Sequence, residues 1–288
     1  MASQPTELPR ITIATVTRNR ARHLQRTLDG VLADDYPNRE VIVVDGASTD
    51  GTVELLRSYG DRIRWISEPD RGEYDAWNKA ARMATGEIFK WLPDDDRLRP
   101  GAPRLAAAYL AEHPEVDIVF GQTQVWQEHP DGTLTPLPEE PMTDASRLTL
   151  KHFLRQTHGV TSVAMFARRR VLDRLGPFAI DYACGDTEFW VRAAANGVTM
   201  GVMPETVVDY TITGMNGQIV YNGRIARDLL RINWHYGSIG DVTYTLWHRR
   251  TSILGWNTVS HEVGRRAAAM GLHPRRTLRN LRKRVLGE

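Results

Sequence analysis

The stretch FKWLPDDDRL, residues 89–98, places an apolar run directly before three adjacent carboxylates, Asp94, Asp95 and Asp96. The run that ends at Leu92 is typical of a strand buried in a core. Three like charges side by side repel one another, so a strand end seldom keeps them for stability alone. Such a cluster can bind a divalent metal through hard oxygen ligands, take part in acid–base catalysis, or form a solvated turn. The surrounding segments narrow these uses.

Upstream of the acidic cluster, short apolar runs alternate with amphipathic ones. The runs at 11–16, 40–46, 63–67 and 87–92 are typical of buried strands, and helical spacing follows each of the first three. This alternation predicts an α/β fold with a mostly parallel central sheet flanked by helices. Ligands of such sheets sit beyond the carboxyl ends of the strands. TVTRNR, VVDGASTDG and LPDDDRL all fall there, so we expect them to converge at one edge.

The second half of the chain is less regular. We expect a helix over 101–114, a strand turning into another over 116–126, a strand leading into a helix over 161–176, and a helix over 184–197. From about residue 218 the sequence is mainly helical in pattern and rich in Trp and Arg.

Composition excludes several classes of protein. The chain has 288 residues, 41% hydrophobic and 25% charged, as in an ordinary globular protein. A net charge of +2 argues against a nucleic-acid partner. The single cysteine, Cys184, excludes an internal disulfide, and the N-terminus has no apolar core of a signal peptide. We therefore expect a cytoplasmic protein.

Motifs of several competing activities are absent from the sequence. It contains no G-x-x-x-x-G-K-[ST] loop of P-loop NTPases and no G-x-G-x-x-G after the first strand, as dinucleotide-binding dehydrogenases have. It also lacks Cys/His spacing for zinc and a G-x-S-x-G nucleophile elbow. One or two carboxylates together with substrate phosphates are the usual way to hold Mg²⁺, which favours a phosphate-bearing substrate.

Four segments, taken in order, resemble the family 2 inverting glycosyltransferases, whose nucleotide-sugar-binding fold is called GT-A. Residues 11–32 look like the family's first strand, nucleotide-binding turn and helix, and EVIVVDGASTDGT (40–52) is similar to a strand followed by D-[DG]-x-S-x-D-x-T. Residues 67–96 resemble the stretch that leads to the metal-binding D-x-D motif, above all in a bacterial polysaccharide subgroup with D-x-G-x-Y-D-A-x-N. Residues 168–197 look like the acceptor-side segment that carries the catalytic base.

The resemblance implies an enzyme with two parts. Residues 1–217 would form a GT-A catalytic domain, with about 10–100 binding the nucleotide sugar and 101–217 forming the acceptor side, and 218–288 would form a helical extension. The implied activity is metal-dependent, inverting transfer of a sugar from a nucleotide-diphosphate donor to an acceptor hydroxyl. Its setting would be polysaccharide or glycoconjugate biosynthesis, with a glycan, lipid-linked or small-molecule acceptor.

The resemblance also assigns residues to the donor site. Thr17 and Arg18 would line the base pocket, and Asp45 matches the first nucleotide-binding acid. Gly46 stands where many relatives have a second Asp that helps to read a uracil base, so the base is left open. The remaining donor-side matches are Arg71, Asn78, Asp94 and Asp95.

The same resemblance also assigns residues to metal binding and to catalysis. Asp96 would be the direct ligand of Mn²⁺ or Mg²⁺, with Asp95 beside it, and Asp186 matches the general base. Glu188 lies two residues on, a spacing that does not share a helical face, so it would support rather than replace the base. His158 is a candidate on the acceptor side, although a lone His is more often structural.

Two other functions stay open at the level of sequence. A sugar-nucleotide pyrophosphorylase needs a glycine-rich loop with a basic residue after the first strand, and TVTRNRARH has the Arg without the glycines. A non-catalytic nucleotide-binding module would also keep the carboxylate pattern. The oligomeric state is open as well, a homodimer included.

The C-terminal segment 273–288 is a basic amphipathic sequence. It carries six Lys/Arg and one Glu, a net charge of +5, which leaves −3 on the rest of the chain because the whole carries +2. Such a helix can lie on an anionic membrane, as a peripheral protein with a lipid-linked acceptor would require, or pack on its own domain.

Overall fold

The computed structural model describes residues 8–138, 143–213 and 222–245. By its internal contacts the chain divides into two compact units, Met1–Asn216 and Gly217–Glu288. Each unit is described by itself. The expected membrane-binding segment 273–288 lies outside the described residues.

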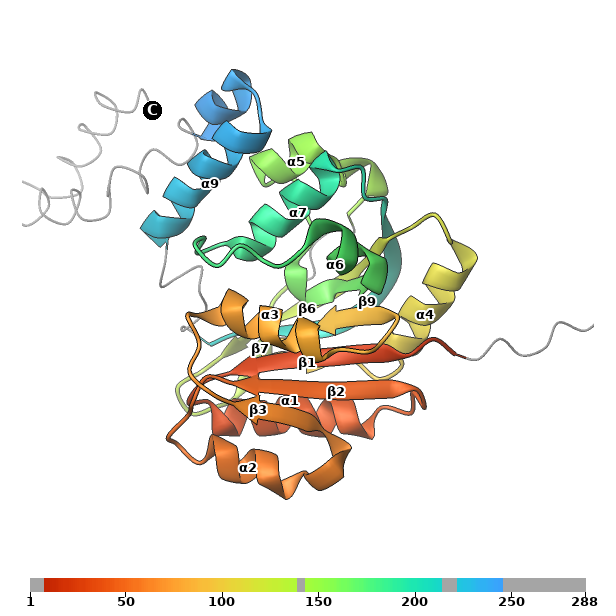
Figure 1. Cartoon of the computed structure of the whole chain (residues 1–288), viewed down its shortest axis with the longest axis vertical. Helices are drawn as coiled ribbons and strands as arrows, with labels where there is room; N and C mark the ends of the chain where they lie inside the picture. The colour runs from red at the N-terminus through yellow and green to blue at the C-terminus, as the bar shows by residue number, and fades with distance from the viewer. Residues whose placement is uncertain (1–7, 139–142, 214–221, 246–288) are drawn as a thin grey trace, which may run out of the picture. The chain divides into compact units, whose positions relative to one another are not determined.

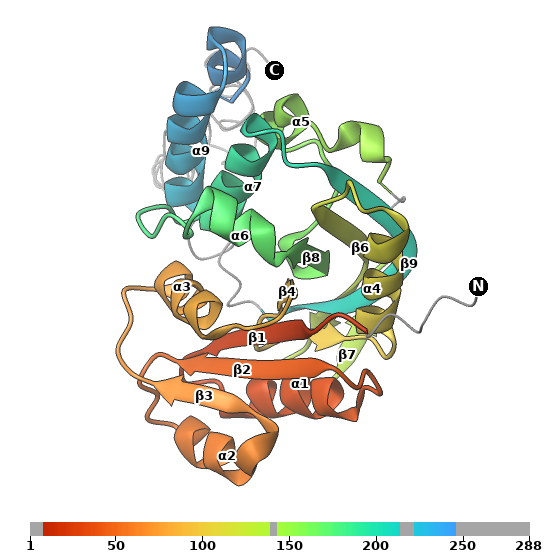
Figure 2. The ribbon, with the colours of Figure 1, turned by 45° about the vertical axis from the view of Figure 1, so that its right-hand side comes forward.

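The first unit begins with four parallel strands, β1 (Ile11–Thr17), β2 (Arg39–Asp45), β3 (Arg64–Ser67) and β4 (Ile88–Trp91). They lie in the order β3-β2-β1-β4. Figure 1 shows β3, β2 and β1 side by side, and Figure 2 shows β4 next to β1. In the register of β1 and β2, Thr17 lies opposite Asp45. The ends of these strands therefore meet at one edge, as the sequence pattern predicts.

Helices cover both faces of this parallel part (Figure 2). α1 (Ala21–Ala33) and α2 (Thr52–Ser58) lie on one face and α3 (Glu73–Met83) lies on the other. The apolar side of α1, which includes Leu24, Leu28 and Val31, is fully buried. Burial of such side chains supplies most of the stability of a short amphipathic helix.

The other part of the sheet is mixed. β8 (Met165–Arg168) pairs antiparallel with β4, and β6 (Ile118–Glu128) pairs antiparallel with β8 and parallel with β9 (Met200–Ile212). β5 (Arg97–Leu98) pairs with the far side of β9, and β7 (Leu134–Pro136) pairs with β6. The expected pair of strands within 116–126 is instead one long strand, whose register against β9 shifts near Gln122.

The remaining described elements of this unit are four helices and three 3-10 turns. The helices are α4 (Ala102–Glu112), α5 (Leu150–Arg155), α6 (Arg169–Leu175) and α7 (Gly185–Ala195), with 3-10 turns η1 (Gly60–Arg62), η2 (Ala145–Arg147) and η3 (Ser162–Ala164). The turn η1 connects α2 to β3, and the others belong to the mixed part of the sheet. After α7, Gly197 has a φ of 69° and its N–H reaches the Ala194 carbonyl. This left-handed cap ends the helix.

The helix α2 begins at Thr52, whose backbone N–H donates to the Asp50 carboxylate at 3.1 Å. Ser48, in the turn between β2 and α2, donates its hydroxyl to Asp45. Between these two residues the chain turns through Ala47, which has a φ of 58°. This turn brings the Ser48 hydroxyl back to the carboxylate at the end of β2.

The second unit is described over α9 (Asn222–Tyr236) and the residues that follow it to Thr245. Ala226, Leu229 and Ile232 form the buried side of α9, while Trp234 is 78% exposed. None of the described helices is long and apolar enough to cross a membrane.

Candidate active site

Two loops at the edge of the sheet are tied to each other. Asn19, after β1, has a φ of 55°, and its side-chain oxygen accepts the Thr49 N–H at 2.8 Å. Its own N–H donates to the Ser48 hydroxyl at 2.7 Å, and the Ala21 N–H donates to Asp50 at 3.1 Å. The turns after β1 and β2 therefore form one connected rim at the strand ends.

The three carboxylates after β4 fold back onto α1. Asp94 accepts the Thr17 hydroxyl at 2.6 Å, and Thr27 of α1 donates its hydroxyl to the carbonyls of Asp94 and Asp96. Arg20, directly before α1, lies 3.3 Å from Asp94 and 2.6 Å from Asp95. One guanidinium is thus placed against a cluster of three acids.

Burial raises the free-energy cost of ionising the carboxylates of this cluster. It raises the pKa of Asp94 to about 7, although Arg20 and the Thr17 hydroxyl act in the opposite direction. Burial, followed by the charge of Asp95, raises the pKa of Asp96 well above its usual range. For Arg20 burial alone would lower the pKa, and the charges of Asp94 and Asp95 more than offset it, so its pKa is raised. A cation at this position would lower the cost of ionising the acids.

Asp96 has one oxygen in use and one free of hydrogen bonds. Oδ1 accepts the Thr211 N–H at 2.9 Å, and Oδ2 is buried without a hydrogen-bond partner in the described part of the chain. Buried carboxylate oxygens are rarely left unpaired, so this one needs a ligand such as a cation or a water. Within the described ranges, no group of three or more His, Cys, Asp or Glu has the geometry of a complete metal site.

Asp45 is fully buried at the end of β2. Its carboxylate accepts the Ser48 N–H at 3.0 Å, the Ser67 hydroxyl at 2.6 Å and the Ser48 hydroxyl. These bonds join the turns after β2 and β3, which is the structural role that an Asp turn commonly has. Asp45 therefore shapes the rim whether or not it also touches a ligand.

The glycine beside it leaves space for another carboxylate. A Cβ added to Gly46 would lie 2.4 Å from Asp70 Oδ2 and 3.3 Å from Arg18 Cδ. The other oxygen of Asp70 accepts the Gly72 N–H at 2.8 Å. An acid is thus present where the family pattern puts a second Asp, but it comes from the turn after β3.

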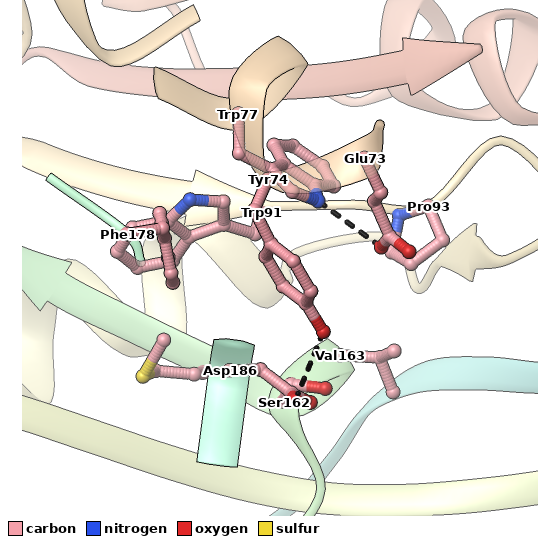
Figure 3. A pocket seen from close by; sticks show the side chains of 10 residues that line it. Glu73, Tyr74, Trp77, Trp91, Pro93, Ser162, Val163, Phe178 and Asp186 are labelled. Atoms are coloured by element: carbon pink, nitrogen blue, oxygen red, sulfur yellow. Dashed lines mark hydrogen bonds between the residues drawn. The ribbon is translucent and has the colours of Figure 1, made fainter. Parts of the chain in front are cut away.

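Asp186 lies in the first turn of α7, where helix N–H groups favour a carboxylate. Its Oδ1 accepts the Thr187 N–H at 2.8 Å and the Tyr74 hydroxyl at 3.2 Å. Figure 3 shows Tyr74 pointing from α3 toward Asp186. The two residues are 112 positions apart in the sequence.

A cavity of about 40 Å³ lies beside this pair and reaches Trp91 and Pro93 at the end of β4. Its walls are mainly aromatic and apolar, with Asp186, Glu73 and Ser162 as polar members (Figure 3). The lining residues are Glu73, Tyr74, Trp77, Trp91, Pro93, Ser162, Val163, Met165, Phe178 and Asp186. Pro93 directly precedes Asp94, and Glu73 lies within charge–charge range of both Asp186 and Asp95. Asp95 and Asp96 themselves line a separate pocket, with Thr27 of α1 and Thr211 of β9.

Two of the expected donor-site residues are engaged with the protein itself. Asn78 is buried, and its amide donates to the Phe178 carbonyl at 2.9 Å and accepts the Phe178 N–H at 2.8 Å. It therefore clamps α3 to the acceptor-side segment. Arg71 is exposed and pairs with Asp75 at 3.2 Å across the start of α3.

The two expected acceptor-side residues also have internal partners. Glu188 is buried and makes a bidentate ion pair with Arg192, both contacts at 3.0 Å. His158 packs with Phe153 and Trp190, and burial lowers the pKa of His158 to about 4. Neither residue is among those that line the cavity at Asp186.

The sequence interpretation did not single out Arg20, Asp70 or Tyr74. Arg20 stands in the quoted turn TVTRNR, and Asp70 and Tyr74 stand in the motif D-x-G-x-Y-D-A-x-N. The motif therefore marks Asp70 and Tyr74 as candidate site residues. Their contact partners lie in other segments of the chain, which a local motif cannot identify.

A family model and two curated relatives that match this chain are all named as glycosyltransferases. The family model for glycosyl transferase family 2 matches residues 12–176, more than half of the chain. A glycosyltransferase of PGL/p-HBAD biosynthesis from Mycobacterium bovis is 29% identical over 195 residues, which cover 65% of this chain and 71% of the relative. A glycosyltransferase of Mycobacterium tuberculosis, named as uncharacterized, is 30% identical over 193 residues, or 66% of this chain and 70% of the relative.

Solved structures share the fold at low identity. TarS of S. aureus, in complex with UDP-GlcNAc, matches with a TM-score of 0.65 and 17% identity, covering 88% of this chain and 76% of that one. The mannosyltransferase PcManGT of Pyrobaculum calidifontis, in complex with GDP-Man and Mn²⁺, matches with a TM-score of 0.63 and 22% identity. That match covers 97% of this chain and 81% of the mannosyltransferase.

Proposed function

This chain belongs to glycosyl transferase family 2, and on that premise we propose that Asp186 is the general base of an inverting sugar transfer. The observation that carries the proposal is the placement of Asp186. It stands at the helix start of α7, beside a cavity whose wall includes Pro93, the residue directly before Asp94, and Glu73, which lies within charge–charge range of both Asp186 and Asp95. A base on one side and a phosphate-holding cluster on the other is the arrangement that a direct displacement needs.

The chemistry follows from that arrangement. An acceptor hydroxyl has a pKa far above 7 and must lose its proton as it attacks the anomeric carbon. The Asp186 carboxylate takes this proton while the bond from the sugar to the nucleoside diphosphate breaks on the opposite face. One displacement without a covalent intermediate inverts the anomeric configuration.

The donor nucleotide would bind at the rim formed by the strand ends. Thr17, Arg18 and Asp45 come from the turns after β1 and β2, and Asp94 and Asp95 from the turn after β4. Asp70 joins this set because it lies in the space that Gly46 leaves open. Arg71 is exposed enough to reach a phosphate, whereas the amide of Asn78 is occupied by the Phe178 backbone.

The acidic cluster fits a divalent cation. Asp96 Oδ2 has no hydrogen-bond partner among the residues that the structure describes, Asp95 is its neighbour, and burial raises the pKa of Asp94. Together these features support a site with excess negative charge. Hard oxygen ligands suit Mn²⁺ and Mg²⁺, and we assign Asp96 and Asp95 to hold the ion. When bound, such an ion supplies Lewis-acid stabilisation of the charge on the leaving diphosphate.

The related enzymes support the kind of substrate. TarS binds UDP-GlcNAc and PcManGT binds GDP-Man with Mn²⁺, so the donor here would be a nucleotide-diphosphate sugar. The mycobacterial relative acts in PGL/p-HBAD biosynthesis, which supports a role in glycoconjugate or polysaccharide assembly. The family match favours transfer over the pyrophosphorylase alternative.

A binding screen tests the proposed donor site. UDP, GDP, ADP, CDP and dTDP are each added to the protein with and without Mn²⁺, and the melting temperature is measured. We expect one or two of them to raise it only with Mn²⁺, since a ligand of the native state stabilises it. Asp95→Asn and Asp96→Asn should remove most of this shift. Equal shifts without Mn²⁺, or in both variants, would contradict the metal assignment.

A further inference from the structure

We propose that Tyr74 is a positioning residue that holds the Asp186 carboxylate in its productive orientation. The inference rests on the proposed function, because it takes Asp186 as the base. The donor-site and metal assignments above do not include Tyr74. The contact of Tyr74 with Asp186 also gives a physical link between α3, a helix of the proposed donor side, and the base on the acceptor side.

The contact itself is a phenol donating to a carboxylate. The Tyr74 hydroxyl lies 3.2 Å from Asp186 Oδ1, and the Thr187 N–H holds the same oxygen at 2.8 Å. With two donors on Oδ1, the rotation of the carboxylate is restricted. The geometry leaves Oδ2 as the oxygen to receive the proton of the acceptor.

The ring of Tyr74 is itself held in place from two sides. A Cβ on Gly185 would lie 2.9 Å from two ring carbons of Tyr74, so the backbone at the start of α7 packs directly on the ring. The Phe178 ring lies on another side, with centroids 5.9 Å apart. Phe178 is fixed in turn by the two Asn78 hydrogen bonds. This packing leaves the hydroxyl few positions other than the one at Asp186.

The phenol remains a donor over the working pH range. Burial, followed by the charge of Asp186, raises the pKa of Tyr74 well above its ordinary value. A neutral phenol that donates to a carboxylate favours the charged form of that carboxylate. The other titratable groups close to the pair are Glu73 and Cys184. Neither is changed in the test below.

The position of Tyr74 in α3 gives the contact a further consequence. The turn directly before α3 contains Asp70, which we place at the nucleotide. Occupation of the donor site would therefore fix the end of α3 from which Tyr74 reaches the base. The base would be best oriented when the donor is bound.

The test compares Tyr74→Phe with a matched control, Tyr59→Phe. Tyr59 also donates its hydroxyl to a carboxylate, that of Asp29 at 2.9 Å, but lies at the end of α2 away from the cavity. Turnover is measured as release of nucleoside diphosphate from UDP-GlcNAc and from GDP-mannose, with Mn²⁺ present and water as the acceptor. Nucleotide affinity is measured by titration of UDP and GDP.

We expect Tyr74→Phe to lower kcat about ten- to a hundredfold, the loss of one hydrogen bond to a charged group. Nucleotide affinity should stay within about twofold, because the hydroxyl acts on the base and not on the nucleotide. Tyr59→Phe should change neither kcat nor nucleotide affinity. Wild-type kcat in Tyr74→Phe, the same loss in both variants, or a loss of nucleotide affinity as large as the loss of kcat would overturn the proposal.

A second measurement separates this inference from the proposed function. A double-mutant cycle in urea unfolding combines Tyr74→Phe with Asp186→Ala and needs no substrate. We expect a coupling between the two sites that differs from zero, and no coupling would overturn the inference. If Asp186→Asn keeps normal turnover, the proposed function fails, and the cycle still decides whether the hydroxyl holds the carboxylate.

Discussion

At the scale of single residues, a buried lysine stands close to the acidic cluster. Lys90, in the middle of β4, is fully buried and donates to the backbone carbonyls of Trp91 and Val163. Its charge has no carboxylate in contact among the described residues, and burial lowers the pKa of Lys90 to about 7. Lys90 thus joins β4 to the turn η3, whose Val163 lines the cavity.

The depressed pKa of Lys90 predicts a pH dependence of stability. Between pH 7 and about 10.4 the unfolded chain binds a proton that the folded chain has lost, so folding is favoured as the pH rises. The contribution of Lys90 to the folding constant should grow by about tenfold per pH unit there. Urea unfolding at pH 7 to 9 measures it. Lys90→Met should be less pH-dependent than the wild type, and equal slopes would contradict the assignment.

Gly46 and Asp70 give a prediction for the nucleotide pocket. In Gly46→Ala the new Cβ would displace the Asp70 carboxylate, whose Oδ2 lies 2.4 Å from it. Loss of one hydrogen bond to a charged group corresponds to about a tenfold weaker affinity. Gly46→Ala, Asp70→Ala and the double variant should all bind the nucleoside diphosphate about tenfold more weakly, as isothermal titration would show. Additive losses, or normal affinity in Gly46→Ala, would count against a role for Asp70.

At the scale of elements, the Asn78 clamp joins α3 to the segment before α7. Asn78→Ala leaves the buried Phe178 N–H and carbonyl without partners, so we expect a loss of about 2–4 kcal/mol of unfolding free energy. The control is Asn196→Ala, which removes one exposed bond to Arg192 and should cost about 0.5 kcal/mol or less. Chemical denaturation measures both. Similar small losses in the two variants would mean that the clamp contributes little.

The elements also show how far sequence reasoning reaches. The strands β1 to β4 follow apolar runs with helical spacing between them, so local pattern was enough to place them and the edge where their ends meet. The mixed pairing of β6, β8 and β9 joins segments far apart in the chain, and no local period specifies such a partner. The long β6 was expected as two strands for this reason.

The same limit applies to the site. Asp45, Asp94 and Asp186 stand at strand and helix ends that the pattern itself marks. The contacts of Arg20 and Tyr74 depend on tertiary packing, since Tyr74 meets its partner across 112 residues. Glu188 and Asn78 fit the family pattern in type, yet the fold engages them with Arg192 and Phe178, which sequence alone does not show.

At the scale of the whole molecule, the proposed base and the residue before the acidic cluster, Pro93, line one cavity. The strand ends that we propose to bind the nucleotide belong to the first part of the chain, and α7 belongs to a later part. The arrangement implies two separable functions, donor binding at the acidic cluster and proton removal at Asp186. A substitution at one should leave the other largely intact.

Asp186→Asn therefore tests the account most directly, because it keeps the size of the side chain and removes the base. Transfer from the nucleotide sugar, measured as release of nucleoside diphosphate, is compared with Mn²⁺-dependent nucleotide binding in the same variant. The account predicts that turnover falls by at least about a thousandfold while the binding constant stays within about twofold, as expected when a group acts in the transition state alone. Near-normal turnover in Asp186→Asn would contradict it.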